Sequence, residues 1–301
     1  MRDAATLERI RSLAIPPAWG DVWICPVANG HLQAVGTDAA GRRQYLYHPR
    51  WREHRDREKF ADMLAFARTM PGMRRAIAAH LRREGPTRER VLAGAVALLD
   101  RGLFRIGGEA YAEENGSYGL ATLERRHVRL GERGVLVFDY PAKTGRRRVQ
   151  EVVDPALYRL ASELKRARRR GSEFLAYRNG RGWVDVDSAA INAFVKELTG
   201  DGFSAKDFRT WHATVLAAAS VARVGTRTSV RGRERAVREA ICDVAESLGN
   251  TPAVCRASYV DPRVLDLYRA GATIDPALRR QDEVEAAVIE LLESRDDVCP
   301  P

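Results

Sequence analysis

Tyr259 lies in a short segment whose two helix starts would hold its hydroxyl in place. Thr-Pro at 251–252 and Asp-Pro at 261–262 each put a capping side chain before a proline at the first helical position. Gly249 is placed to end the preceding helix. A phenolic oxygen held in this way can act as a nucleophile once its target is positioned. Taken alone, Tyr259 is more readily explained as a packing aromatic, like most of the nine tyrosines in the chain.

The charged residues favour a polyanionic partner. The formal net charge is +10 and the isoelectric point is about 9.8, which indicates nucleic acid first and an anionic membrane surface second. Only five of the 50 cationic residues are lysines: Lys59, Lys143, Lys165, Lys196 and Lys206. An arginine keeps its proton, whereas neighbouring charges can lower the pKa of a lysine until it gives its proton up. A lysine in a functional position is therefore a candidate acid.

Several classes of protein are excluded by the sequence. The chain has no Walker-type nucleotide loop, no acidic cluster with two-metal spacing and no metal-ligand spacing among its four cysteines, which we interpret as reduced thiols. It also lacks an apolar run of about eighteen residues and a secretory signal. We therefore predict a cytoplasmic protein that uses neither cofactor nor metal and does not enter a membrane.

The N-terminal residues predict a small antiparallel meander with strands at 21–25, 31–36 and 43–48. Asn29-Gly30 and the turn at 38–41 separate the strands. Period-2 alternation puts Tyr45 and Tyr47 on one face, and arginines at 42, 43 and 50 lie nearby. Such a face either contacts bases and phosphates or is half-buried with its arginines in solvent.

From about residue 58 the pattern becomes helical, which predicts a domain of residues 1–58 and a mainly helical domain of residues 59–301. Lys143 falls in a turn between strands at 135–140 and 147–153. The other expected elements are helices at 59–69, 72–83, 86–101, 155–170, 188–199 and 204–221, a helix that ends at 248, and helices at 262–270 and 276–294. The fold class is α+β.

Residues 250–262, Asn-Thr-Pro-Ala-Val-x-Arg-x-Ser-Tyr-Val-Asp-Pro, resemble the segment around the nucleophilic tyrosine of type IB DNA topoisomerases. The similarity is greatest to the small poxvirus-like enzymes found in bacteria. Further similar blocks follow in family order, and the resemblance spans about residues 15–265. It implies that Tyr259 is the nucleophile and that the remaining catalytic positions are Arg105, Lys143, Arg209 and Asn250. Many family members have histidine at the position of Asn250.

The resemblance also implies the DNA contacts. The strand Gly-Arg-Arg-Gln-Tyr-x-Tyr at 41–47 resembles a DNA-contacting strand of the family. The DNA-binding residues expected are Arg42, Arg43, Gln44, Tyr45, Tyr47, Tyr111, Glu114, Asn115 and Lys206. The family's fold, a C-shaped clamp of the recombinase and type IB topoisomerase kind, would close on double-stranded DNA. We expect a monomer that relaxes supercoils through a 3′-phosphotyrosyl intermediate.

This set of residues suits phosphoryl transfer without a metal. Two arginines can donate to the non-bridging oxygens of a phosphodiester, Lys143 can protonate the leaving 5′ oxygen, and the amide of Asn250 can donate one neutral hydrogen bond. Two alternatives remain open. One is a tyrosine recombinase, although Lys-Asp-Phe-Arg at 206–209 differs from the His-x-x-Arg usual there. The other is a basic DNA-binding protein that has kept the fold without activity.

Overall fold

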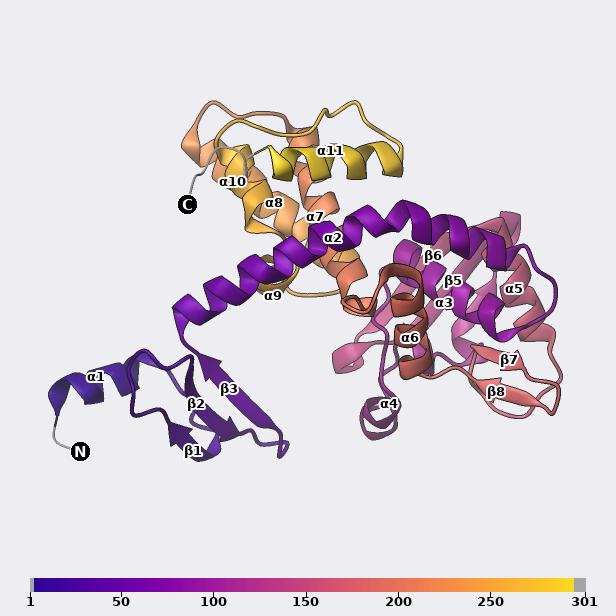
Figure 1. Ribbon diagram of the computed structural model, residues 1–301, viewed down its shortest axis with the longest axis horizontal. Helices are drawn as coiled ribbons and strands as arrows, with labels where there is room; N and C mark the ends of the chain where they lie inside the picture. The colour runs from indigo at the N-terminus through magenta and orange to yellow at the C-terminus, as the bar shows by residue number, and fades with distance from the viewer. Residues whose placement is uncertain (1–2, 295–301) are drawn as a thin grey trace. The chain divides into compact units, whose positions relative to one another are not determined.

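The computed structural model describes residues 3–294, with the side chains at 110, 111 and 144 outside this description. The chain is rich in helix and carries small antiparallel sheets (Figure 1). It divides into two compact units, Met1–Asp62 and Met63–Pro301. The division falls inside one long helix, so the two units are joined by regular structure and not by a loop.

The first unit contains helix α1 (Ala4–Ser12) and a meander of β1 (Gly20–Ile24), β2 (Leu32–Thr37) and β3 (Arg43–Tyr47). The strands are antiparallel in the order β1-β2-β3, which confirms the predicted meander (Figure 1). Arg9 ties the helix to the sheet, because its guanidinium donates to Gln33 Oε1 at 2.9 Å and to the carbonyl of Cys25 at 2.8 Å.

Helix α2 (Pro49–Leu81) corrects the prediction of two helices split at Pro71. A proline inside a helix removes one hydrogen bond and costs about 3 kcal/mol. The helix nevertheless continues because residues on both sides of the proline share one buried face: Phe66, Ala67, Met70, Met73 and Ile77. Burying several large side chains at roughly 1.5–3 kcal/mol each outweighs the local penalty.

The second unit surrounds helix α7 (Ala205–Val224), which is buried along most of its length. Its other helices are α3 (Arg88–Gly102), α4 (Glu109–Asn115), α5 (Pro155–Arg166), α6 (Ser188–Thr199), α8 (Val230–Leu248), α9 (Pro252–Ser258), α10 (Pro262–Arg269) and α11 (Gln281–Glu293). One sheet has the order β4-β5-β6, formed by Val128–Leu130, Val135–Pro141 and Arg147–Val153, and a hairpin pairs β7 (Ala176–Arg178) with β8 (Trp183–Asp185).

A buried polar cluster joins α2, α3, α7 and α11. The guanidinium of Arg74 donates to both oxygens of Asp100 and of Glu285, and His212 contacts Asp100 at 3.0 Å. Burial acts to raise the pKa of Asp100, but the hydrogen bonds from Arg74 and His212 outweigh it and hold this pKa well below its usual range. Paired in this way, the buried charges fix the relative positions of these helices.

Two predicted helix boundaries are wrong. The helix expected over 155–170 ends at Arg166, because no large apolar residue lies between Leu164 and Gly171 and the four positions after Arg166 include three arginines. The helix expected from 276 begins at Gln281. Asp275 accepts a hydrogen bond from the backbone of Ala277 but caps only a turn, since the residues up to 280 bring too little apolar surface to bury.

Candidate active site

Arg105 is positioned by the connection between α3 and α4. Helix α3 ends with Leu103 in the left-handed region, at φ 55°, and the carbonyl of Arg105 accepts from Leu120 at 2.8 Å. Gly107 and Gly119 touch through their backbones, and a Cβ on either would collide with the other. The close approach of these two segments holds the arginine backbone in one conformation.

Arg209 lies on α7 and is only 4% exposed. Its guanidinium donates to the carbonyl of Leu103 and, at 2.9 Å, to that of Leu248, the last residue of α8. Burial, followed by the nearby charge of Arg105, lowers the pKa of Arg209 to about 10, and Tyr259 opposes this shift. The side chain therefore remains cationic at neutral pH.

Tyr259 caps the C-terminus of α9, as the segment predicts, and Thr251 caps its start. The tyrosine N–H donates to the carbonyl of Cys255 at 3.0 Å, and the hydroxyl of Thr214 on α7 donates to the tyrosine carbonyl at 3.4 Å. The ring centroid lies 5.3 Å from the guanidinium carbon of Arg209. The backbone on both sides of the tyrosine is thus anchored, and a buried cation lies against the ring.

Asn250 follows the left-handed Gly249 that ends α8. Its side-chain oxygen accepts a hydrogen bond from Arg105, which also donates to the carbonyl of Gly249 at 3.1 Å. The buried amide nitrogen of Asn250 has no hydrogen-bond partner of normal geometry among the described residues, although it interacts with the thiol of Cys255, a weak acceptor. A buried donor in this state is suited to an acceptor from outside the chain.

Lys143 is exposed at the tip of the hairpin between β5 and β6, which agrees with the predicted turn. The N–H of Ala142 donates to the carbonyl of Arg146 at 2.8 Å and closes the hairpin. Paired strands of seven residues each support this tip, so the hairpin presents the lysine from a stiff base.

Four of the five predicted catalytic residues line one cavity of about 570 Å³: Arg105, Lys143, Asn250 and Tyr259. Arg209 lies behind it against the tyrosine ring. The cavity is also lined by Arg146, which the sequence prediction missed although it is close to Lys143 in the same turn. Residues up to 154 positions apart in the sequence therefore meet at one cationic surface, where a tyrosine hydroxyl, a lysine and two arginines surround space for a phosphate.

The predicted DNA-contacting strand is only partly free to contact a ligand. Arg42 and Gln44 both donate to Asp38, and hydrogen bonds from Arg42, opposed in part by burial, lower the pKa of this aspartate to about 2. Tyr45 and Tyr47 are 45% and 39% exposed, with ring centroids 6.3 Å apart. Arg43 is also exposed.

Trp23 is a further exposed aromatic on this sheet, and the sequence prediction did not include it. It pairs with Val35, which pairs with Tyr45 on the other side, so all three side chains share a face. The cross-strand register, which follows from the turn positions, is the signal that would have found it. The face as a whole offers three aromatic rings.

The remaining predicted DNA contacts belong to the second unit. Glu114 and Asn115 are exposed near the C-terminus of α4, and Lys206 is exposed in the first turn of α7. The side chain of Tyr111 lies outside the described part of the chain.

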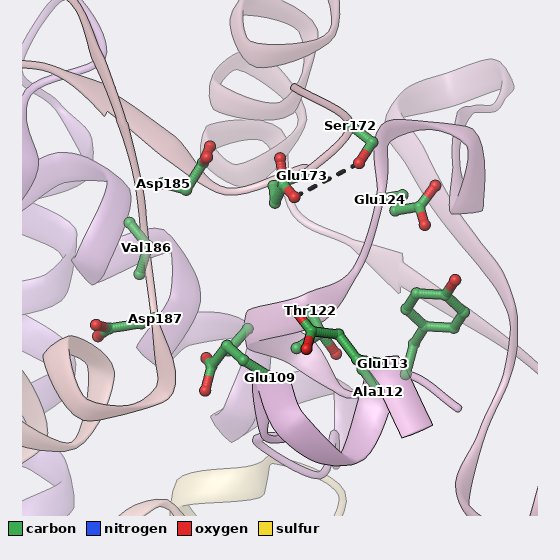
Figure 2. A pocket seen from close by; sticks show the side chains of 12 residues that line it. Glu109, Ala112, Glu113, Thr122, Glu124, Ser172, Glu173, Asp185, Val186 and Asp187 are labelled. Carbon is green, nitrogen blue, oxygen red and sulfur yellow. Dashed lines mark hydrogen bonds between the residues drawn. The ribbon is translucent and has the colours of Figure 1, made fainter. Parts of the chain in front are cut away.

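A second cavity, of about 320 Å³, differs from the first in charge. Figure 2 shows the carboxylates that surround it: Glu109, Glu113, Glu124, Glu173, Asp185 and Asp187. Burial and the nearby charge of Glu173 raise the pKa of Asp185. An anionic cavity repels phosphate, so this cavity does not suit a phosphodiester. Among residues 3–294, no group of three or more His, Cys, Asp and Glu side chains is placed to hold a metal ion.

Comparison with known proteins agrees with this geometry. Residues 48–275 match the family model of the eukaryotic DNA topoisomerase I catalytic core. The chain belongs to the type IB DNA topoisomerase family. Residues 1–38 match the N-terminal domain of bacterial DNA topoisomerase IB. As a member of this family, the protein is a DNA topoisomerase, an isomerase, and its α+β organisation is that of a type IB catalytic core with a bacterial N-terminal domain.

Individual relatives are similar over different lengths. DNA topoisomerase 1B of Acanthamoeba polyphaga mimivirus is 28% identical over 300 residues, which cover 97% of this chain and 88% of the viral protein. DNA topoisomerase 1 of Daucus carota is 28% identical over 130 residues, and that of Schizosaccharomyces pombe is 31% identical over 131. These two matches cover 43% and 42% of this chain and 15% of each relative. Within the described residues, no helix has the length and apolar character needed to span a membrane.

Proposed function

We propose that this chain relaxes positive and negative supercoils in double-stranded DNA by cutting and rejoining one strand, with Tyr259 as the nucleophile. The phenolic oxygen forms a bond to phosphorus, and the bond from phosphorus to the 5′ oxygen breaks. The product is a 3′-phosphotyrosyl protein and a free 5′ hydroxyl, and the phenolic proton passes to water. The covalent bond conserves the energy of the phosphodiester, so rejoining needs no ATP.

The two arginines and the lysine act on different oxygens of the phosphate in this step. Arg105 and Arg209 donate to the non-bridging oxygens, where negative charge increases in the transition state. The burial of Arg209 supports this role, because a cation removed from water interacts more strongly with a phosphate that excludes the remaining solvent. Lys143 reaches from its hairpin to give a proton to the leaving 5′ oxygen, which is otherwise a poor leaving group.

Asn250 donates a hydrogen bond from its amide nitrogen to one non-bridging oxygen. Its two ends have different functions in this proposal. The side-chain oxygen holds Arg105, and the amide nitrogen, which lacks a partner of normal geometry among the described residues, is free to meet the phosphate. Histidine, common here in the family, can donate from a similar place, so the exchange keeps a donor.

We further propose that the two units close around a duplex as a C-shaped clamp of the recombinase and topoisomerase kind, and that one chain acts as a monomer. Exposed Tyr45, Tyr47 and Arg43 would contact the duplex from the first unit, and Glu114, Asn115 and Lys206 from the second. A DNA substrate and a bacterial N-terminal domain support a location at the nucleoid in the cytoplasm.

The observation that carries the proposal is the meeting of Arg105, Lys143, Asn250 and Tyr259 around one cavity with Arg209 against the tyrosine ring. The test is relaxation of supercoiled plasmid in EDTA without ATP, with denaturant added to trap protein on DNA. We expect relaxation and a covalent adduct from the natural chain. Complete dependence on magnesium or ATP, or binding without an adduct, would refute the proposal.

A further inference from the structure

The C-terminus of α8 accepts hydrogen bonds from three arginines on three consecutive carbonyls. Arg148 donates to the carbonyl of Ser247 at 2.5 Å, Arg209 to that of Leu248 at 2.9 Å, and Arg105 to that of Gly249 at 3.1 Å. The last carbonyls of a helix lack partners within it and carry the negative end of the helix dipole. They therefore offset the repulsion among three guanidinium groups brought close together.

Arg148 differs from the other two arginines because it does not line the cavity. It projects from β6, directly across from Tyr140 of β5, and it is half-buried. Burial lowers its pKa, and Tyr140 opposes this shift. Desolvating a cation is unfavourable, and the hydrogen bond to Ser247 together with the interaction with Tyr140 offsets part of this cost.

That turn carries the groups that act in the site. Gly249, at φ 62°, sends the chain from α8 into Asn250, and a Cβ at Gly249 would collide with the guanidinium of Arg148. Arg105 is in turn hydrogen-bonded to the carbonyl of Gly249 and the side chain of Asn250. A shift of this turn would therefore move both a predicted phosphate donor and the partner of a predicted catalytic arginine.

We propose that Arg148 is a positioning residue for the cleavage step: it fixes the C-terminal turn of α8 and so sets Asn250 and Arg105 toward the scissile phosphate. This inference rests on the proposed function. It requires that losing Arg148 slow cleavage at saturating DNA more than it weakens DNA binding, because the residue acts through the turn and not by contact with DNA.

The test is single-turnover formation of the covalent adduct at saturating DNA, with noncovalent affinity measured separately in the Tyr259→Phe background. Arg148→Ala should slow adduct formation by about 10- to 100-fold, the range expected when a reacting group is displaced by a fraction of an ångström to one ångström. Affinity should change by less than about threefold, since one of many cations is lost.

The neighbouring Arg147 is the matched control. It is exposed and paired with Asp139 at 2.7 Å, so Arg147→Ala removes the same charge from the same strand without touching the turn. We expect its rate within about twofold of the natural chain. Arg148→Lys keeps the positive charge and a hydrogen-bond donor on a shorter side chain, so it should recover part of the rate. If Arg148→Ala does not fold, Arg148→Lys takes its place in the comparison.

A double-mutant cycle tests the route of the effect. If Arg148 acts through Asn250, the two substitutions are coupled, and Arg148→Ala should cost at most about threefold in the Asn250→Ala background. The inference is overturned if Arg148→Ala cleaves as fast as Arg147→Ala, if its defect lies in affinity, or if the two defects multiply. Failure of the proposed function would look different, because the natural chain would then form no adduct.

Discussion

Substitutions at Asn250 separate the two functions of its side chain. Asn250→Ala removes both the oxygen that holds Arg105 and the amide nitrogen proposed to meet the phosphate. Asn250→Asp has nearly the same shape and keeps an oxygen for Arg105, but it replaces the donor with a second anionic oxygen. A purely positioning role therefore predicts that Asp is tolerated, whereas a donor role predicts that Asp is worse than Ala.

The size of the effect follows from the burial of this amide. Losing one donor to a transition-state oxyanion costs about 10²–10³ in rate in a closed site, and we expect about 10- to 1000-fold here for Asn250→Ala. Two like charges about 4 Å apart repel by about 4 kcal/mol at an effective dielectric constant of 20. Because Arg105 neutralises part of the new charge, we expect Asn250→Asp to be slower than Asn250→Ala by a further ~10- to 100-fold.

The assay is single-turnover adduct formation with enzyme in excess over supercoiled plasmid, stopped with denaturant. Asn250→His serves as the control, since imidazole can donate from a similar place, and it should remain active. A rate for Asn250→Asp at or above that of Asn250→Ala would show that Asn250 does not donate to the phosphate. No loss in either variant would remove the residue from the site altogether.

Three other predictions concern the nucleophile, the acid and the core. Tyr259→Phe should abolish the adduct and leave salt-dependent DNA binding nearly unchanged in a filter-binding titration; an adduct from this variant would assign the nucleophile to another tyrosine. Lys143→Ala should recover much of its cleavage rate on DNA whose bridging 5′ oxygen is sulfur, because a thiolate leaves without a proton, while Arg209→Ala should recover little; equal defects for Lys143→Ala on both substrates would exclude Lys143 as the acid. Asp100→Asn should lower the melting temperature by roughly 6–12 °C, from about 3 kcal/mol for breaking a buried pair with Arg74. The pKa of Asp100 is held well below its ordinary value of 3.8, so its contribution is complete above that pH and is lost as the pH falls from 3.8 toward the lowered value. The difference in melting temperature between the two proteins should therefore be constant above pH 3.8 and narrow steadily as the pH is lowered further; a difference that does not narrow below pH 3.8 would contradict this linkage.

Local signals in the sequence predicted the elements that depend on neighbours in the chain. The turn residues predicted all three strands of the N-terminal meander, and the structure confirms them. Thr251 and Asp261 cap the starts of their helices, as the pairs Thr251-Pro252 and Asp261-Pro262 indicate. Ser204 and Asp207 form the predicted capping box, with the N–H of Ser204 donating to Asp207 at 2.8 Å. Such interactions span three or four residues, so composition and spacing suffice to predict them.

Elements whose form depends on distant packing were predicted less well. Pro71 suggested a helix boundary, but its helix continues because its buried face packs in the core. A window of a few residues shows the proline but not the buried face that this helix shares with the rest of the core.

By itself, the sequence determined the residue types available for chemistry, their family resemblance and the local structure on which each one sits. Only the tertiary structure decided that Arg105, Arg148 and Arg209 meet at the end of α8 and that Tyr259 lies against a buried cation. The physical reason is the range of the forces involved. Capping and turns are set by hydrogen bonds between near neighbours, whereas the site forms when apolar faces far apart in the chain are buried together and bring the cations with them.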